Sequence, residues 1–208
     1  MMTSSQENNL GYEILNLDEE SVKRLLDCYE SPLYRFFYYS IGNFHDAQDL
    51  CSQTWAEFVK AVKLKRFREP DCLSGFLFGI ARNLLLQTNR KSKKNLYLSD
   101  ELNQHICHHV NVSHQVGARD ELNAVFRVIV QFKEPERQVM LLRFVENLKV
   151  QDIALALDLP INSVKSYIHR CRKQLKQHLS HIRCPQWKSL TCNINVFSTR
   201  YPNRWSVV

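Results

Sequence analysis

The stretch VQDIALALDLPINSVKSYIHRCRKQL, residues 150–175, contains two amphipathic helical patterns separated by a short break. Side chains three or four positions apart share one helix face. The apolar stripes consist of Val150, Ile153, Ala154 and Leu157 in the first half and Val164, Ile168, Cys171 and Leu175 in the second. Pro160 cannot continue the first helix, and the second could begin with Pro160 in its first turn or with Asn162 as N-cap. The pattern predicts a helix-turn-helix.

The second helix of this motif carries charge of one sign. Residues 162–188 include seven Lys or Arg and no Asp or Glu, whereas a solvated helix usually mixes both signs for i,i+4 pairing. This imbalance argues against the simpler alternative, a helical hairpin with a solvated charged face. A helix-turn-helix places the N-terminal part of its second helix in the DNA major groove. We therefore predict base-edge contacts from Asn162, Ser163, Lys165, Ser166 and His169, and phosphate contacts from Arg170, Arg172 and Lys173.

The amino-acid composition limits the classes to which the protein can belong. The 208 residues are 44% hydrophobic and can form one or two domains with a real core. The net charge of +7 fits a nucleic-acid partner, although a membrane surface would also attract such a chain. No apolar run approaches the roughly 18 residues that a spanning helix needs, and the first 20 residues hold five acids, no base and no signal-peptide core. We expect a cytoplasmic protein whose seven unpaired-looking cysteines are reduced thiols.

The distribution of Gly, Pro and apolar periodicity predicts an all-α fold. Five glycines, six prolines and few alternating β-branched runs leave little room for strands. We expect two small helical domains joined by a linker, with the helix-turn-helix in the second. The expected segments are a polar, disordered N-terminal segment at 1–17, a helical block at 18–94, a linker at 95–116, a second block at 117–182, and a tail at 183–208 whose role is unknown.

A second cationic region lies in the first helical block. Residues 63–94 contain nine basic side chains against two acidic ones. The same region holds Phe67, Phe76 and Phe78, and bases combined with aromatic rings are the mixture that binds single-stranded nucleic acid. Packing in the core is nevertheless the default role of any one aromatic, and of most in the run from 33 to 41.

Three motifs carry a family resemblance. HDAQDLCSQTWAEFVKAV (45–62) resembles D-A-E-D-L-x-Q-E-T-F, and GFLFGIARNLLLQTNRK (75–91) resembles W-L-x-x-I-A-R-N-x-x-x-D-x-x-R. RQVMLLRFVENLKVQDIALALDLPINSVKSYIHRCRKQL (137–175) resembles R-x-V-x-x-L-R-x-x-E-x-L-S-x-x-E-I-A-x-x-L followed by V-K-S-x-x-x-R-A-R-x-x-L. With the motifs in this order and separation, the chain is similar to bacterial RNA polymerase sigma factors of the small, two-domain extracytoplasmic-function class.

The resemblance implies a sigma factor that binds core RNA polymerase and directs promoter-specific transcription initiation. Region 2, at 18–94, would bind the polymerase clamp and recognise and melt the −10 element, with a flipped base captured by the loop 67–74. Region 4, at 117–182, would recognise the −35 duplex, and the linker would thread through the polymerase. The implied polymerase-binding residues are Asp46, Asp49 and Gln53. The implied −10 residues are Phe67, Arg82, Asn83, Arg90, Lys91, Lys93 and Lys94. The resemblance also allows an anti-sigma factor as a further partner.

Several positions depart from the family pattern. Gln48 and Gln53 replace acids in the clamp-binding helix, so this interface is expected to be less electrostatic. Gly79 replaces a large side chain inside a helix, at a cost of about 1 kcal/mol of helix stability. Gln87 replaces a frequent Asp, and Lys149 replaces the usual N-capping Ser. These departures affect the expected promoter preference more than the fold.

Other functional classes fit the sequence less well. A conventional helix-turn-helix regulator that binds an operator would have the same helix pair, but it does not need the cationic aromatic block at 63–94. An adaptor that binds polymerase without DNA is a further alternative. An enzyme is not expected, because the chain has no phosphate loop, metal dyad or nucleophile elbow.

Two groups of His and Cys residues have the side-chain types of zinc ligands. They are His105, Cys107, His108, His109 and His114 in the linker, and Cys171, His178, His181 and Cys184 near the end of the second block. Neither contains a C-x-x-C pair, and Cys171 is needed on the apolar stripe. A polar linker and a solvated helix end are the simpler interpretation. We therefore expect no metal site, no cofactor and no membrane insertion.

Overall fold

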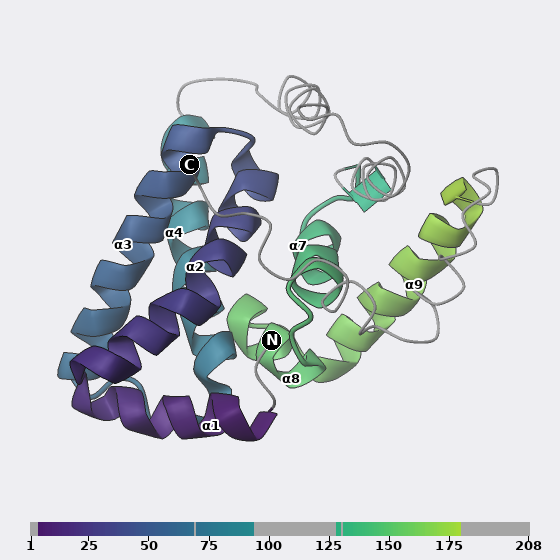
Figure 1. Cartoon of the computed structure of the whole chain (residues 1–208). Helices are drawn as coiled ribbons and strands as arrows, with labels where there is room; N and C mark the ends of the chain where they lie inside the picture. Colours follow the sequence, from purple (N-terminus) through teal and green to yellow (C-terminus); the bar gives the residue numbers. More distant parts are fainter. Residues whose placement is uncertain (1–3, 69, 94–127, 130, 180–208) are drawn as a thin grey trace, which may run out of the picture.

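The computed structural model describes residues 4–68, 70–93, 128–129 and 131–179, and over these residues the protein is all-α, as predicted. The segment expected as region 2 contains α2 (Glu19–Ile41), α3 (Phe44–Lys63), η2 (Pro70–Cys72) and α4 (Leu73–Lys93), and α1 (Ser4–Glu13) and η1 (Ile14–Asn16) precede it. Region 4 consists of α7 (Glu136–Met140), the π-helical turn η3 (Leu141–Val145), α8 (Val150–Leu157) and α9 (Ile161–Leu179). Figure 1 shows the helices of region 2 gathered on one side and α9 at the opposite edge.

The N-terminal segment is folded, contrary to the expectation of disorder for residues 1–17. Residues 4–16 form α1 and η1, and Leu10 and Ile14 are fully buried in the core. These two side chains lie four residues apart and therefore share one helix face. The segment is too polar for its sequence alone to predict a helix, and its order comes from docking this small apolar face on the other helices.

Local capping sets the ends of α2 and α3. The Asp18 side chain accepts a hydrogen bond from the Ser21 backbone N–H at 3.0 Å at the start of α2. At the end of α2, Gly42 adopts a left-handed conformation with φ 71°, which glycine reaches without a Cβ clash. The Asn43 side chain then accepts from the backbone N–H of Asp46 at 3.3 Å. Side-chain N-caps of this kind stabilise a helix by about 1 kcal/mol.

Aromatic side chains fill the core of region 2. Phe36, Phe37, Phe58 and Phe78 are each at most 1% exposed. The ring of Phe36 makes edge contacts with Phe37 and Phe78 at a centroid distance of 5.6 Å in both cases. Such edge-to-face packing adds to the free energy of burial. The predicted packing role of the aromatics in the 33–41 run is therefore confirmed for Phe36 and Phe37.

The predicted helix-turn-helix is confirmed as α8 and α9. After α8 ends at Leu157, Asp158 adopts a left-handed conformation with φ 50°. The backbone carbonyl of Pro160 accepts from Ser163 N–H at 2.9 Å and from Val164 N–H at 3.1 Å. Since α9 begins at Ile161, Asn162 lies inside the helix and is not its N-cap. Pro160 directly precedes the helix, so neither start that the sequence left open is matched in full.

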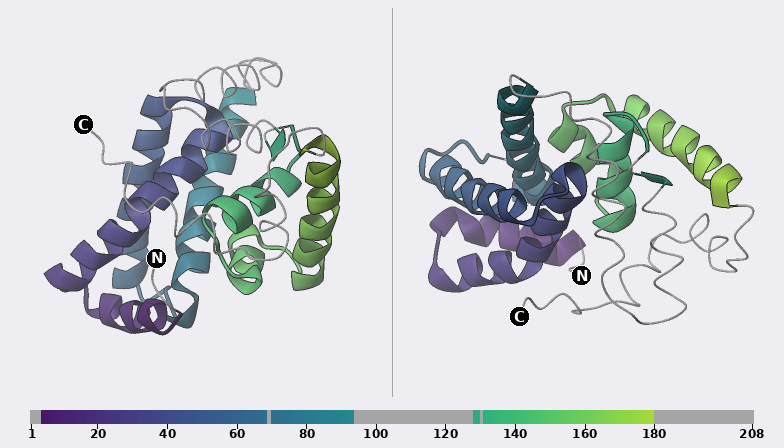
Figure 2. Two further views of the ribbon diagram at one scale, coloured as in Figure 1. Left: turned by 45° about the vertical axis from the view of Figure 1, so that its right-hand side comes forward. Right: turned by 90° about the horizontal axis from the view of Figure 1, so that it is seen from above.

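The two regions pack directly against each other through α4 and α8. Ile153, Leu157 and Val164 belong to the same buried cluster as Leu77 and Phe78 of region 2. Figures 1 and 2 show α8 lying between α4 and α9. The linker expected at 95–116 lies outside the described residues.

A buried ion pair also joins the two regions. Arg35 Nη2 of α2 lies 2.6 Å from Glu146 Oε2, and Arg35 Nε lies 3.0 Å from Glu146 Oε1. The Glu146 side chain is 2% exposed. Burial would lower the pKa of Arg35, but the attraction of Glu146 raises it above its ordinary value. Removing one partner of a buried pair costs about 3–5 kcal/mol, so this contact fixes how region 4 sits on region 2.

Gly75 and Gly79 permit the close approach of α8 to α4. A Cβ added at Gly75 would lie 3.1 Å from the Cα and from the carbonyl oxygen of Asp152, and 3.0 Å from Leu155 Cδ2. A Cβ added at Gly79 would lie 3.7 Å from Ala156 Cα, which is ordinary van der Waals contact. The departure from the family pattern at Gly79 therefore falls on the surface of α4 that receives α8.

We expect Gly75→Ala and Gly79→Ala to change stability in opposite directions. Both substitutions raise helix propensity by about 1 kcal/mol. Gly79→Ala should therefore raise the free energy of unfolding, whereas Gly75→Ala must displace the α8 backbone and should lower it by about 1–2 kcal/mol. Urea denaturation followed by circular dichroism measures both values. Equal stabilisation by the two variants would show that α8 does not lie this close to α4.

Candidate nucleic-acid and polymerase interfaces

The outer face of α9 collects most of the predicted −35 residues. Asn162, Lys165, Ser166, His169 and Lys173 are exposed, and Ser163 is half-buried. The opposite face packs inward through Val164, Cys171 and Leu175, which are at most 8% exposed. The hydroxyl of Ser166 donates to the Asn162 carbonyl at 2.8 Å, so its proton is already engaged within the helix. The helix thus presents a polar, cationic surface to solvent, and Figure 1 shows α9 at the edge of the molecule opposite the helices of region 2.

Two arginines of α9 are tied to region 4 itself. Arg170 Nη2 lies 3.0 Å from Glu136 Oε1, and its guanidinium lies 5.0 Å from the ring centroid of Tyr167. Arg172 is half-buried, with its guanidinium 5.8 Å from the ring of Phe144. Cation–π contacts of this kind contribute about 0.5–1 kcal/mol at exposed sites. Arg172 therefore supports the packing of α9 on η3, and the exposed Lys173 is the better candidate for a contact with phosphate alone.

The predicted −10 residues of α4 differ in accessibility. Asn83 is exposed, while Arg82 is half-buried. The Nε atom of Arg82 is buried and has no hydrogen-bond partner within the described part of the chain. A buried donor without a partner is costly, so this N–H is available to donate to an acceptor. Arg90, Lys91 and Lys93 lie in the last turns of α4, and Lys94 lies outside the described residues.

Phe67 lies in the core and not on the surface. Its side chain is 3% exposed, and its ring centroid lies 5.1 Å from that of Phe76 and 5.9 Å from that of Phe58. In this conformation the ring presents no face on which a base could stack. The aromatic residues of this block therefore build the support behind the loop 67–74.

An exposed cationic turn leads into this loop. Lys63, Lys65, Arg66 and Arg68 are all exposed. Lys65 has φ 55°, and the N–H of Arg66 donates to the carbonyl of Ala61 at 2.8 Å, which ends α3 in a Schellman-type turn. These charges belong to the cationic region 63–94, but they are not among the predicted site residues. Their signal was the run KLKRFR, and the structure shows that the turn presents them to solvent next to η2.

The predicted polymerase-binding residues share one face of α3. Asp46, Asp49 and Gln53 are exposed, whereas Leu50 and Phe58 on the opposite face are buried. The helix lies on the far side of region 2 from α8 and α9 in Figure 1. The exposed face of α3 and the outer face of α9 are therefore separate surfaces.

The thiols do not form a reactive or metal-binding centre in the described part of the chain. Burial raises the pKa of Cys51 to about 12 and that of Cys171 to about 11. Both are therefore neutral at physiological pH, and the neutral thiol is a poor nucleophile and a poor metal ligand. No group of three or more His, Cys, Asp or Glu side chains could hold a metal ion among the described residues. Of the two predicted His and Cys groups, 105–114 and the pair at 181 and 184 lie outside them.

Charged groups also meet where α1, α2 and α8 converge. Lys149 Nζ lies 3.9 Å from Glu7 Oε2, and Tyr29 donates to Glu7 Oε1 at 3.0 Å. Burial raises the pKa of Asp152, and the nearby Glu7 raises it further, while Lys149 lowers it. The Lys149 side chain makes no N-cap hydrogen bond, as its replacement of Ser predicts. This junction binds α1 to both regions.

The helices in the described segments are not suited to span a bilayer. None combines the length and the apolar character that a crossing requires.

The structure defines an all-α protein with a helix-turn-helix over the described residues, and comparison with known proteins gives its family. Residues 25–95 match Sigma-70 region 2, and residues 122–175 match Sigma-70, region 4. The chain is 27% identical over 172 residues to the ECF RNA polymerase sigma factor SigW of Bacillus subtilis, covering 78% of this chain and 90% of that protein. It is 24% identical over 189 residues to the RNA polymerase sigma-H factor of Pseudomonas aeruginosa, covering 86% and 96%.

A solved structure has the same fold. CnrH, in complex with the cytosolic domain of CnrY, superposes with a TM-score of 0.58 at 18% identity, over 85% of this chain and 98% of that chain. The chain belongs to the sigma-70 family, in its extracytoplasmic-function group, and directs transcription initiation as a sigma factor. The resemblance found from the sequence motifs is thereby confirmed.

Proposed function

We propose that this sigma factor docks on the clamp of core RNA polymerase through Asp46, Asp49 and Gln53 of α3, and recognises the −35 duplex through the outer face of α9. The observation that carries the proposal is the exposure of these faces on opposite sides of the molecule, because both can then be occupied at once. Neither activity requires covalent chemistry, and we propose that the protein is not an enzyme and acts in the cytoplasm, where its polymerase partner is found.

Opening of the −10 element is assigned to α4 and the loop before it. Asn83 would contact a base on the separated strand, and the unsatisfied Nε of Arg82 would donate to it or to a phosphate. Lys63, Arg66 and Arg68 of the exposed turn, with Arg90, Lys91, Lys93 and Lys94, would neutralise the backbone. Phe67 would support the loop from behind. Two DNA contacts in one chain would then reinforce each other as a bivalent attachment.

A transcription assay separates this function from the alternative of an operator-binding regulator. The purified protein is added to core RNA polymerase on a library of genomic fragments. We expect transcripts that depend on the protein and start downstream of shared −35 and −10 elements. If the protein retards DNA fragments but yields no transcripts with core polymerase, the operator-binding alternative is correct.

A protein regulator is included among the proposed partners. CnrH, which has the same fold, is held by the cytosolic domain of CnrY, and a comparable anti-sigma segment could bind the present chain. Co-purification with proteins encoded beside its gene, followed by a test of whether they block the transcripts, would identify such a partner. The absence of any inhibitory partner would remove it from the proposal without affecting DNA recognition.

Lys165→Ala and Lys173→Ala should have different effects on promoter recognition. Lys165 lies near the start of α9, where bases come within reach, and its loss should change the preferred −35 sequence at a cost of about 1–3 kcal/mol for the cognate base. Lys173 lies two turns later, and its loss should weaken binding to all sequences alike. It should also reduce the slope of the logarithm of the binding constant against the logarithm of the salt concentration by about one unit. Selection from a library randomised in the −35 element, beside a salt titration, measures both effects.

Arg172→Ala serves as a third member of this series. Because Arg172 packs over Phe144, its loss should lower thermal stability as well as DNA affinity, unlike the loss of Lys173. If Lys165→Ala leaves the selected consensus unchanged and Lys173→Ala keeps the salt slope of the original protein, the outer face of α9 is a solvated surface that does not bind DNA.

A further inference from the structure

The N-terminal helix α1 lies directly against the loop proposed to capture the −10 base. Gly11 of α1 is buried, and a Cβ added there would lie 2.0 Å from the carbonyl oxygen of Pro70 and 2.8 Å from its carbonyl carbon. Real Cβ atoms essentially never approach another heavy atom to less than 3.0 Å. Since Pro70 presents backbone atoms, no side-chain rotation could relieve the clash. Gly11 thus allows the loop backbone to rest on the surface of α1.

Glycine is needed here for space and not for backbone conformation. Gly42 is the glycine with positive φ among the described residues, and Gly11 lies within a regular helix. A glycine inside a helix costs about 1 kcal/mol relative to alanine. The glycine lowers helix propensity, but it permits the contact between α1 and Pro70.

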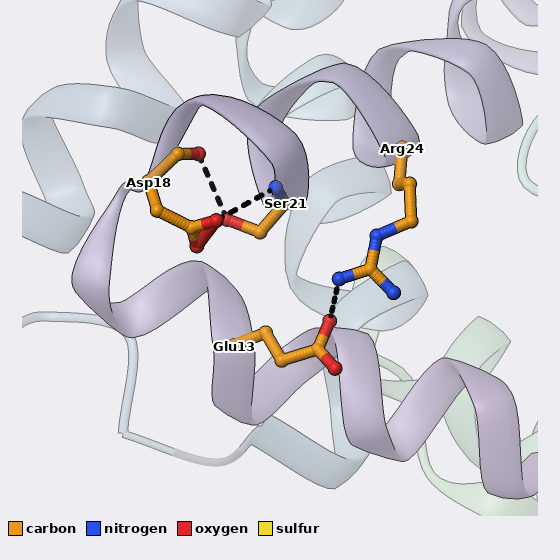
Figure 3. Close-up of polar contacts among 4 residues, drawn as sticks. All are labelled: Glu13, Asp18, Ser21 and Arg24. Atoms are coloured by element: carbon orange, nitrogen blue, oxygen red, sulfur yellow. Dashed lines mark hydrogen bonds and ion pairs between the residues drawn. The ribbon is translucent and has the colours of Figure 1, made fainter.

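The α1 helix also makes contacts that do not involve the loop. Leu10 and Ile14 are fully buried. Glu13 pairs with Arg24 of α2, while Asp18, which follows η1, caps α2 through Ser21, as Figure 3 shows. The α1 helix therefore packs on η2 and is also attached to α2, so that α1 and the loop fix each other's position.

The position of Pro70 determines where the neighbouring polar groups lie. Arg68 and Asp71 on either side of it are exposed, and Leu73 begins α4 fully buried. A shift of the Pro70 carbonyl would move the exposed arginines and the loop 67–74 relative to Asn83 on α4. Recognition sites depend on placement to a fraction of an ångström, and a displacement of about 1 Å can cost a factor on the order of 100.

We propose that Gly11 is a positioning residue for −10 recognition, and that its missing side chain sets the distance between the capture loop and α4. This inference rests on the proposed function, in which the loop 67–74 and Asn83 take the flipped base.

Gly11→Ala in the full-length protein tests the proposal. Holoenzyme formed with core polymerase is used to select from single-stranded DNA randomised in the −10 element. We expect discrimination at the captured base to fall about tenfold, with unchanged helical content, affinity for core polymerase and binding of −35 duplex. A general structural defect would instead weaken all of these together. Gly79→Ala, the same chemical change at an ordinary 3.7 Å contact, should keep the original discrimination.

A second variant approaches the contact from the loop. Pro70→Ala keeps the carbonyl but removes the ring that restricts the loop backbone, and it should reduce discrimination in the same direction. If Gly11→Ala folds and discriminates as the original protein does, the proposal is overturned. If Gly11→Ala does not fold, Pro70→Ala decides, and undiminished discrimination in that variant overturns it. If the holoenzyme with the unsubstituted protein prefers no base at −10, the proposed function of region 2 is wrong. The measurement on the unsubstituted protein thus separates that failure from a failure of the role of Gly11.

Discussion

Asp49→Arg should weaken binding to core RNA polymerase by at least about tenfold while leaving the protein folded. Asp49 is exposed beside Asp46 and Gln53 on a helix whose opposite face is buried. A polymerase surface that accepts this acidic face is expected to be basic, and placing like charges across an interface costs several kcal/mol. Because the side chain points to solvent, its replacement removes no packing. Titration of labelled core polymerase measures the affinity, and far-UV circular dichroism verifies the fold.

Asp27→Arg is the matched control for this prediction. Asp27 is also exposed but lies on α2, so the same change in net charge is made away from the proposed face. It should retain the affinity of the original protein for core polymerase. Equal affinity for Asp49→Arg and Asp27→Arg, with unchanged circular dichroism, would remove this face of α3 from the polymerase interface.

Replacing Arg82 and Asn83 together by Ala should reduce open-complex formation by about 10- to 100-fold, since hydrogen bonds with charged partners contribute about 1.5–3 kcal/mol. Their proposed DNA partners become accessible only after strand separation, so closed-complex binding should change much less. A promoter with a pre-melted −10 bubble should recover part of the lost activity. Permanganate reactivity of thymines in the −10 element measures the extent of melting.

Single substitutions separate the two residues and exclude a loss of stability. Asn83 is exposed, so Asn83→Ala should reduce melting without lowering thermal stability. Asn9→Ala is the same change at an exposed position on α1, outside the proposed melting surface, and should leave melting intact. Arg82 is half-buried, and its own variant must therefore be checked by thermal denaturation. Normal thymine reactivity in the stable double variant would contradict a melting role for this surface.

Features set by local sequence could be predicted without the structure. The helix-turn-helix follows from apolar residues at helical spacing and from Pro160 between them, because both act on residues a few positions apart. The separation of α9 into an apolar and a cationic face follows from the same periodicity, and so do the exposed acids of α3. The motifs quoted for region 2 and region 4 then identified the sigma-70 family before any contact was known.

Features set by contacts between distant segments could not be predicted. The N-terminal segment becomes a helix only because Leu10 and Ile14 find a core made by the helices that follow. The family resemblance places Phe67 among the −10 residues, but Phe58 and Phe76 enclose its ring. In the sequence, Arg172 and Lys173 are equivalent candidates for phosphate contacts. Only the structure shows that the Arg172 guanidinium lies over the ring of Phe144 in η3.

The glycines show the same division. As residues inside helices, Gly11, Gly75 and Gly79 appear in the sequence only as a loss of helix propensity. The structure places Pro70 against the first and α8 against the other two. Helical periodicity depends on residues three or four positions apart, so the sequence by itself determined the helices and the faces of α3 and α9. The space that each glycine leaves is used by a segment far along the chain, so only the tertiary structure decided how the two regions and the −10 loop are held.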